Sequence, residues 1–178
     1  MAKEVMAEGR FLRLVRGDRG WEWAERIHTQ TPVGIVAVTP PTNDAPRGKL
    51  LLVEQLRIPV GKVCIEIPAG LVGDIDGAES WQDAARRELE EETGWTCDRV
   101  EFLTEGPPSA GMSSEMVKLA LAHGLKKIGA GGGDGTEGIT VHEVPLDEVA
   151  AWLAAKVRAG VPVDAKVYAA LFFAITGA

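Results

Sequence analysis

The sequence predicts an α/β protein in which a mixed sheet lies between layers of helices. Three observations predict this class. Short apolar runs recur along the 178 residues at lengths typical of buried strands. Later segments have the polar caps and apolar spacing of helices, and strand-like stretches lie between them. The length suits a single core, so we expect residues 1–178 to form one domain.

The first part of the chain contains the clearest strand signals. Residues 12–14 and 21–23 alternate apolar and polar side chains, which predicts two early strands. Continuous apolar runs at 33–38 and 50–53 predict buried strands, and a further stretch at 63–67 ends at Pro68.

A helix is predicted over about residues 80–93. Ser80 is suited to its N-cap, and Gly94 is suited to a left-handed residue at its C-terminal end. Beyond it, strand-like stretches are expected at 100–103, 116–122 and 139–144. Two further helices are expected, over 147–157 and from Asp164 onwards. Four aromatic side chains are expected in the core: Trp95, Trp152, Phe172 and Phe173.

Composition limits the classes of partner. The formal net charge of -7 and the isoelectric point near 5.0 argue against a protein that binds nucleic-acid backbones or anionic membranes. The longest apolar stretch, around residues 167–175, is too short to cross a bilayer. Two cysteines cannot form a disulfide framework, and the first residues lack a secretory signal pattern. We therefore expect a cytoplasmic protein with no nucleic-acid or membrane partner.

Three carboxylates share one face of the helix predicted at 80–93. Glu88, Glu91 and Glu92 stand at positions i, i+3 and i+4, about one turn apart. Like charges this close destabilise a helix, and a hard divalent cation such as Mg²⁺ would offset their repulsion. The same cation would let an acidic site accept a phosphate substrate. A solvated acidic face is the alternative interpretation.

The spacing around these carboxylates has the form of a known motif. Gly73, Glu79 and the run from Arg87 to Trp95 reproduce Gly-x5-Glu-x7-Arg-Glu-U-x-Glu-Glu-x-Gly-U, where U is apolar. The chain therefore resembles the Nudix hydrolases. This resemblance implies a Nudix α/β/α sandwich with an extra N-terminal strand region, and Mg²⁺, or Mn²⁺ in its place, on the three carboxylates. We expect Arg87 to pair with Glu79 and to hold the metal ligands in register.

Two segments before the motif resemble the Nudix branch that cleaves ADP-ribose and other nucleoside diphosphate sugars. The runs 54–57 and 66–70 match the Glu-Gln-x-Arg and Glu-x-Pro-Ala-Gly patterns of that branch. The resemblance implies that Arg57 approaches the diphosphate, that Glu66 belongs to the substrate pocket and that the Ala69 carbonyl faces a metal. A surface salt bridge is the alternative role for Arg57.

Two further candidates concern the recognition of substrate. The loop over 109–115 is similar to Ser-Pro-Gly-x-x-Thr-Glu in the same branch, although Ala110 replaces the proline. It implies that Glu115 lies in the substrate pocket, with the capping of the next strand as the alternative. Trp23, together with Trp21, is expected either to stack on a nucleobase or to pack in the core or in a dimer.

The general base is expected in a glycine-rich loop. Residues 129–138 resemble the mobile loop that supplies a catalytic glutamate in this branch, so Glu137 is the expected base and Asp134 the alternative. Together with Glu137, the residues expected to act in catalysis are Glu91 and Arg87. His142, on the strand that follows, is expected to be packed or at the surface rather than a ligand.

The function that these residues imply is Mg²⁺-dependent hydrolysis of the diphosphate bond in a nucleotide sugar. ADP-ribose or a similar compound such as GDP-mannose would give a nucleoside monophosphate and a sugar phosphate. The resemblance also implies a homodimer formed through residues 1–32. Two alternatives stay open: hydrolysis of oxidised nucleoside triphosphates, and a Nudix module that senses a nucleotide without cleaving it.

Overall fold

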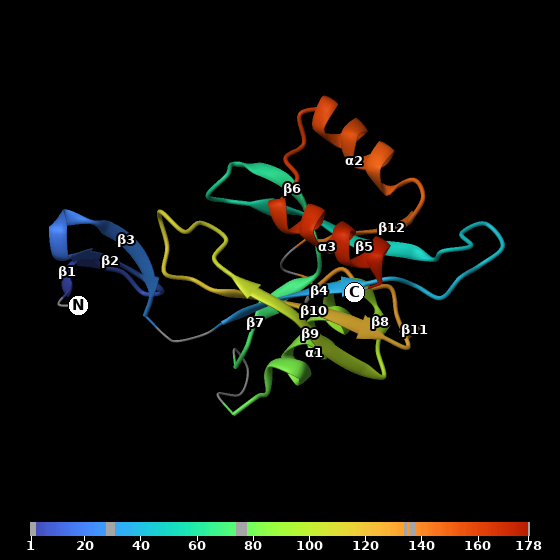
Figure 1. Ribbon diagram of the computed structural model, residues 1–178, viewed down its shortest axis with the longest axis horizontal. Coiled ribbons are helices and arrows are strands. Elements are labelled where there is room, and N and C mark those ends of the chain that lie inside the picture. Colours follow the sequence, from blue (N-terminus) through green and yellow to red (C-terminus); the bar gives the residue numbers. More distant parts are fainter. Residues whose placement is uncertain (1–2, 28–30, 74–77, 134, 136–137, 178) are drawn as a thin grey trace.

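The computed structural model describes residues 3–27, 31–73, 78–133, 135 and 138–177. Its first element is a three-stranded antiparallel sheet, formed by β1 (Lys3–Glu8), β2 (Leu12–Gly17) and β3 (Glu22–Arg26). In Figure 1 this sheet stands to one side of the rest of the molecule. The two early strands predicted from alternation are confirmed as β2 and β3, and β1 is an additional strand.

One mixed sheet and one antiparallel sheet form the body of the protein. One has the order β7 (Ala69–Leu71), β4 (Pro32–Ala37), β10 (Val117–His123) and β9 (Arg99–Gly106), and the contact between β4 and β10 is parallel. The other has the order β12 (Thr140–Pro145), β5 (Lys49–Arg57) and β6 (Lys62–Glu66). A bridge between Val38 and Leu50 links the two. A short pair, β8 (Trp95–Thr96) and β11 (Lys126–Lys127), completes the strands described.

Helices cover both sides of these sheets. Helix α1 (Trp81–Thr93) lies on one side, and α2 (Val149–Arg158) and α3 (Ala165–Thr176) lie on the other (Figure 1). Residues of β4 alternate between the two hydrophobic cores: Val33 and Ile35 pack on the α1 side, whereas Val36 packs on the side of α2 and α3. The predicted α/β/α layering is therefore confirmed.

The caps of α1 are those that the sequence predicts. The Ser80 hydroxyl accepts a hydrogen bond from the Asp83 backbone N–H at 3.1 Å, and Gly94 has a φ of 71° in the left-handed region. A side chain at Gly94 would meet the Gly129 carbonyl oxygen at 2.3 Å, so this end of α1 packs directly on the glycine-rich loop.

One expectation about the core is wrong. Phe172 is 59% exposed on α3, whereas Phe173, beside it, packs against the core. The two side chains are adjacent in sequence and therefore point to different sides of the helix. Trp95 and Trp152 are partly buried against the two cores, as expected. Among the described residues, no helix combines the length and the apolar character needed to cross a membrane.

Candidate active site

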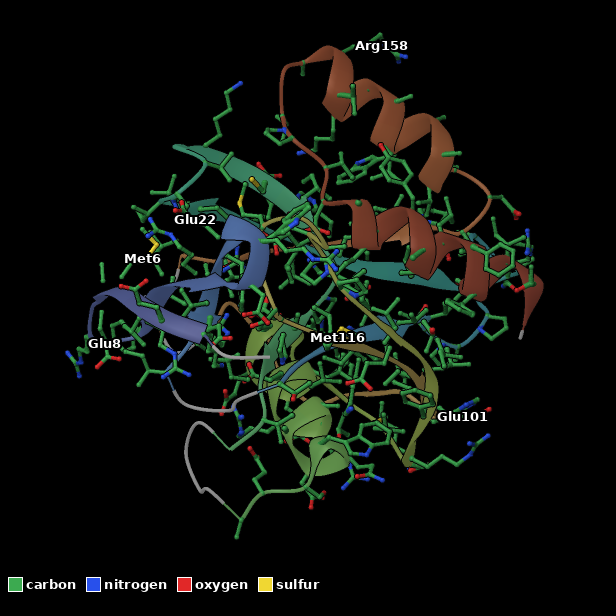
Figure 2. All side chains as sticks on the ribbon, turned by 60° about the vertical axis from the view of Figure 1, so that its left-hand side comes forward. Met6, Glu8, Glu22, Glu101, Met116 and Arg158 are labelled. Carbon is green, nitrogen blue, oxygen red and sulfur yellow. The ribbon has the colours of Figure 1, made fainter. Side chains whose placement is uncertain are left out.

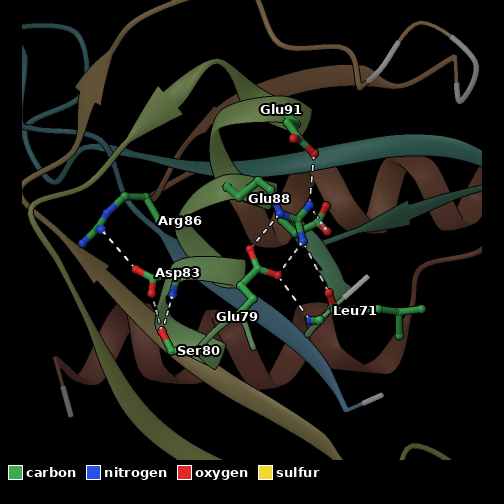
Figure 3. Close-up of polar contacts among 9 residues, drawn as sticks. Leu71, Glu79, Ser80, Asp83, Arg86, Glu88 and Glu91 are labelled. Carbon is green, nitrogen blue, oxygen red and sulfur yellow. Dashed lines mark hydrogen bonds and ion pairs between the residues drawn. The ribbon is translucent and has the colours of Figure 1, made fainter. Parts of the chain in front are cut away.

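Arg87 lies at the centre of the carboxylate face of α1. Its Nε and Nη2 atoms donate to the two carboxylate oxygens of Glu79 at 3.0 and 3.2 Å (Figure 3). Its Nη1 atom donates to Glu88 at 2.8 Å and to Glu91 at 3.2 Å. The predicted pairing of Arg87 with Glu79 is confirmed, and the hydrogen bonds from Arg87 lower the pKa of the Glu79 carboxyl.

The other two contacts of this face reach strand β7. The Glu92 carboxylate accepts a hydrogen bond from the Ala69 backbone N–H at 3.0 Å. The Glu88 carboxylate lies so close to Gly70 that a Cβ there would be 1.9 Å from the Glu88 Cδ atom. Glycine at position 70 is thus required for the Glu88 carboxylate to lie against the β7 backbone. The motif on α1 and the Pro-Ala-Gly run of β7 therefore form one site.

The donors in this site suit a hard divalent cation. Carboxylate and carbonyl oxygens are the protein ligands that Mg²⁺ prefers, and Glu88, Glu91, Glu92 and Ala69 provide them on two adjacent elements. Among the described residues, no three acidic, histidine or cysteine side chains converge closely enough to hold an ion. Arg87 contacts Glu88 and Glu91, and the Glu92 carboxylate accepts a hydrogen bond from the Ala69 amide. The oxygen chemistry of these groups fits the divalent cation that the sequence predicts.

A cleft of about 610 Å³ opens beside Glu88. It contains five of the residues that the sequence assigns to metal or substrate: Arg57, Glu66, Ala69, Glu88 and Glu115. The sequence analysis missed other polar residues that line it, namely Arg26, Asp164 and Lys166. Arg26 is far from Asp164 and Lys166 in the sequence, so only the fold brings it to the same cleft.

Arg57 and Glu66 form a two-pronged ion pair in the wall of the cleft. Arg57 Nε and Nη2 donate to the two oxygens of Glu66 at 2.5 and 2.8 Å, across the antiparallel pair β5 and β6. The Glu66 side chain is only 7% exposed, whereas that of Arg57 is 42% exposed. The hydrogen bonds that Arg57 donates to Glu66 raise the pKa of Arg57, and the charges of Glu92 and Asp164 contribute in the same direction. Arg57 is thus a fixed cation that faces the cleft, so the salt bridge and the substrate-facing role occur together.

A second ion pair comes from the N-terminal sheet. Arg26, at the end of β3, donates through Nε to Glu115 at 2.5 Å. Backbone hydrogen bonds between Ala24 and the loop at Met112 and Ser114 hold the two segments together. Glu115 therefore faces the cleft as expected. Trp23 is not among the residues that line this cleft, and its indole N–H donates to Glu25 at 2.9 Å instead.

The glycine-rich loop is attached to the C-terminal end of α1. The Gly132 N–H donates to the Glu92 carbonyl at 2.9 Å, and the Gly133 N–H donates to the Glu91 carbonyl at 3.0 Å. The described part of the loop therefore begins directly beside the carboxylate helix. The two candidates for the general base, Glu137 and Asp134, lie outside the described residues. His142 is not in the site, because its Nε2 atom is 2.7 Å from the Glu54 carboxylate.

Comparison with known proteins identifies the family of this site. The family model of the NUDIX domain matches residues 29–171, which include the carboxylate helix, the Pro-Ala-Gly run and the described residues that line the cleft, apart from Arg26. The chain belongs to the Nudix family. The resemblance that the motif at 73–95 suggested is confirmed, and the match begins after the N-terminal sheet.

Relatives within the Nudix family include proteins named for ADP-ribose hydrolysis. The methanol dehydrogenase activator of Bacillus methanolicus is 40% identical over 124 residues, which are 69% of this chain and 64% of that protein. The ADP-ribose pyrophosphatase of Bacillus subtilis is 38% identical over 92 residues, which are 52% of this chain and 46% of that protein. The chain thus matches less than two thirds of the length of either relative.

A solved structure has the same fold. The crystal structure of an ADP compounds hydrolase superimposes with a TM-score of 0.61 at 20% sequence identity, covering 84% of this chain and 80% of that one. At this identity the similarity establishes the Nudix fold of the chain. The resemblance to the ADP-ribose pyrophosphatase branch of the family rests on the sequence relatives.

Proposed function

We propose that this protein hydrolyses the diphosphate bond of a nucleoside diphosphate sugar, such as ADP-ribose, and releases a nucleoside monophosphate and a sugar phosphate. The observation that carries the proposal is the cleft, in which the Arg57–Glu66 pair and Glu115 lie beside Ala69, Gly70 and Glu88. A diphosphate in this cleft would contact a fixed guanidinium and the carboxylate face of α1 together.

The residues of the chain have distinct roles in this proposal. Arg57 binds phosphate oxygens, and Glu66 keeps its guanidinium in one orientation. Glu88, Glu91, Glu92 and the Ala69 carbonyl would hold Mg²⁺, which supplies charge neutralisation and lowers the pKa of bound water. Arg87 positions Glu79, Glu88 and Glu91. Glu137 would take the proton from the attacking water.

The proposal includes a homodimer in a reducing compartment. Large apolar side chains on or beside the N-terminal sheet are more than a third exposed: Val5, Met6, Phe11, Leu12, Leu14 and Trp21. Such a set of exposed apolar residues is typical of a surface that is covered in an assembly. Cys64 and Cys97 are both buried thiols, which supports a cytoplasmic location.

A phosphatase-coupled assay tests the activity. ADP-ribose, GDP-mannose, UDP-glucose and an oxidised nucleoside triphosphate are compared at equal concentration with Mg²⁺. We expect phosphate release from one nucleotide sugar above the others and none without metal. Glu91→Gln should lower kcat on the order of a hundredfold or more.

The matched control for this assay is Glu90→Gln. Glu90 is on the same helix, and its carboxylate accepts a hydrogen bond from the Thr96 hydroxyl. The Glu90→Gln variant should therefore have the activity of the wild-type protein. Full activity in Glu91→Gln would contradict the metal assignment, and preference for the triphosphate would contradict the substrate class.

A further inference from the structure

Lys166 is brought to the cleft by an extension of the sheet. Residues 162–164 run beside β6, where Val163 forms a parallel bridge with Ile65. The Ile65 N–H donates to the Pro162 carbonyl at 2.9 Å, and the Asp164 N–H donates to the Ile65 carbonyl at 2.9 Å. Ile65 is fully buried, so this attachment is rigid. It fixes the first turn of α3, with Lys166, at the wall of the cleft.

Lys166 is one of the few cations in a cleft whose described lining residues include more carboxylates than cations. Among the described lining residues, the cations are Arg26, Arg57 and Lys166, and the carboxylates are Glu66, Glu88, Glu115 and Asp164. The carboxylates outnumber the cations, so each cation that contacts an anionic substrate directly offsets part of their repulsion. The N-terminal end of α3, a helix of 12 residues, adds a partial positive charge beside Lys166.

The Lys166 ammonium can bind an anion while it keeps its present partner. Its Nζ atom donates to the Asp164 carboxylate at 2.6 Å, and the Lys166 side chain is 23% exposed. An ammonium group has three N–H donors, so the pair with Asp164 does not use its full capacity. Asp164 thus orients the ammonium, in the same way as Glu66 orients Arg57. Arg57 and Lys166 both line this cleft.

We propose that Lys166 binds the diphosphate of the substrate as the second cation after Arg57. This inference rests on the proposed function. Arg57 supplies a planar fork and Lys166 a point charge, and both contacts would exist in the bound substrate. Loss of Lys166 should therefore raise KM more than it lowers kcat.

The purely structural alternative is that Lys166 only supports the cap of α3. Lys156 offers a close control for it, because its Nζ atom also donates to a carboxylate, that of Glu54, at 2.6 Å. The Lys156 side chain is 24% exposed, nearly the same as that of Lys166, but Lys156 does not line the cleft. The two lysines thus have a similar exposure and a similar carboxylate contact, and Lys156 also lies over the Trp152 ring at 5.0 Å.

Calorimetric titration of the full chain with ADP-ribose and with ADP, in the presence of Mg²⁺, tests the proposal. Glu91→Gln is the background, since it suppresses turnover. Adding Lys166→Met should weaken the binding of both ligands about tenfold. Lys166→Arg should restore most of the affinity, and Lys156→Met should leave it unchanged. Thermal unfolding of each variant shows whether the substitution affects the fold.

Each other outcome overturns a stated part. If adding Lys166→Met left the affinity for both ligands the same as in Glu91→Gln alone, while the wild-type protein hydrolysed ADP-ribose, only the role of Lys166 would be contradicted. Weaker binding of ADP-ribose but not of ADP would mean that Lys166 contacts the sugar, which contradicts the diphosphate assignment. A wild-type protein that neither binds nor hydrolyses any nucleotide sugar would refute the proposed function as well.

Discussion

Gly70 determines where a single carboxylate of the site can lie. Its backbone does not have a positive φ, so alanine would fit the strand, but the new Cβ would collide with the end of the Glu88 side chain. That end is flexible and can move aside, so the fold loses little. The Glu88 carboxylate would leave its place against β7, and the metal site would lose the arrangement that Arg87 and Gly70 maintain.

We therefore expect Gly70→Ala to lower kcat/KM and Mg²⁺ affinity by about 10- to 100-fold, with nearly unchanged thermal stability. Steady-state rates over a Mg²⁺ series, with thermal unfolding in parallel, measure both quantities. Gly106→Ala is the matched control, because a Cβ at Gly106 on β9 meets no atom within 4 Å. Wild-type activity in Gly70→Ala would show that Glu88 does not need this position.

The residues of the site differ in how far the sequence could predict them. Glu88, Glu91, Glu92 and Arg87 lie within one helix, so their spacing alone predicts that they share a face. Arg26 and Lys166 enter the cleft only through backbone contacts of distant segments, Ala24 with Ser114 and Ile65 with Pro162. No local pattern carries such tertiary contacts, and both residues were missed for that reason.

At the scale of elements, one carboxylate joins the strands of the N-terminal sheet. Glu25 on β3 accepts hydrogen bonds from Lys3 on β1 at 2.7 Å and from Arg13 on β2 at 2.8 Å. Trp23 donates to the same carboxylate. These contacts, first of all the one with Lys3, lower the pKa of Glu25 to about 2. The charged carboxylate therefore stabilises this sheet.

The pH dependence follows from the sign of this shift. Because the folded-state pKa of about 2 lies below the ordinary value of 4.5, the stabilisation is complete above pH 4.5 and is lost as the pH falls towards 2. Glu25→Gln should lower stability by about 1–3 kcal/mol at pH 7, and the difference from wild type should shrink below pH 4.5. Denaturant unfolding followed by tryptophan fluorescence, from pH 7 to pH 3.5, measures it.

Glu22→Gln is the control for this titration. Glu22 is on the same strand but pairs with Arg16 at the surface, where both side chains are more than 40% exposed. Exposed pairs contribute about 0–1 kcal/mol, so this variant should resemble wild type at each pH. A difference for Glu25→Gln that stays constant from pH 7 to pH 3.5 would contradict the charge-based explanation.

The sequence predicted those strands and helices whose apolar residues are buried in the core. The strands β4 and β5 and helix α1 have buried faces, and their apolar spacing records this burial. Strand β1 is exposed along its whole length, so it has no buried face and no such pattern. Its place in the sheet depends on the partners of Glu25 and on pairing with β2.

At the scale of the whole molecule, the N-terminal sheet is the part that is least covered by the rest of the chain. It stands apart from the layered body in Figure 1, and Figure 2 shows the side chains that it carries, among them Met6 and Glu22. Phe11 and Trp21 are 63% and 66% exposed, and Met112, in the loop that contacts β3, is 68% exposed. Because Arg26 of this sheet also lines the cleft, a partner that covered the sheet would lie next to the site.

These features predict that a second copy of the chain covers the sheet. Light scattering coupled to size exclusion should give twice the chain mass of 19.0 kDa for the wild-type protein. The double variant Phe11→Ser with Trp21→Ser removes two exposed aromatic side chains and should shift the mass to that of one chain. Phe172→Ser is the control, since Phe172 is 59% exposed on α3 and should leave the dimer intact. A wild-type protein that elutes as a monomer at high concentration would exclude this assembly, and the exposed apolar residues of the sheet would then require another partner.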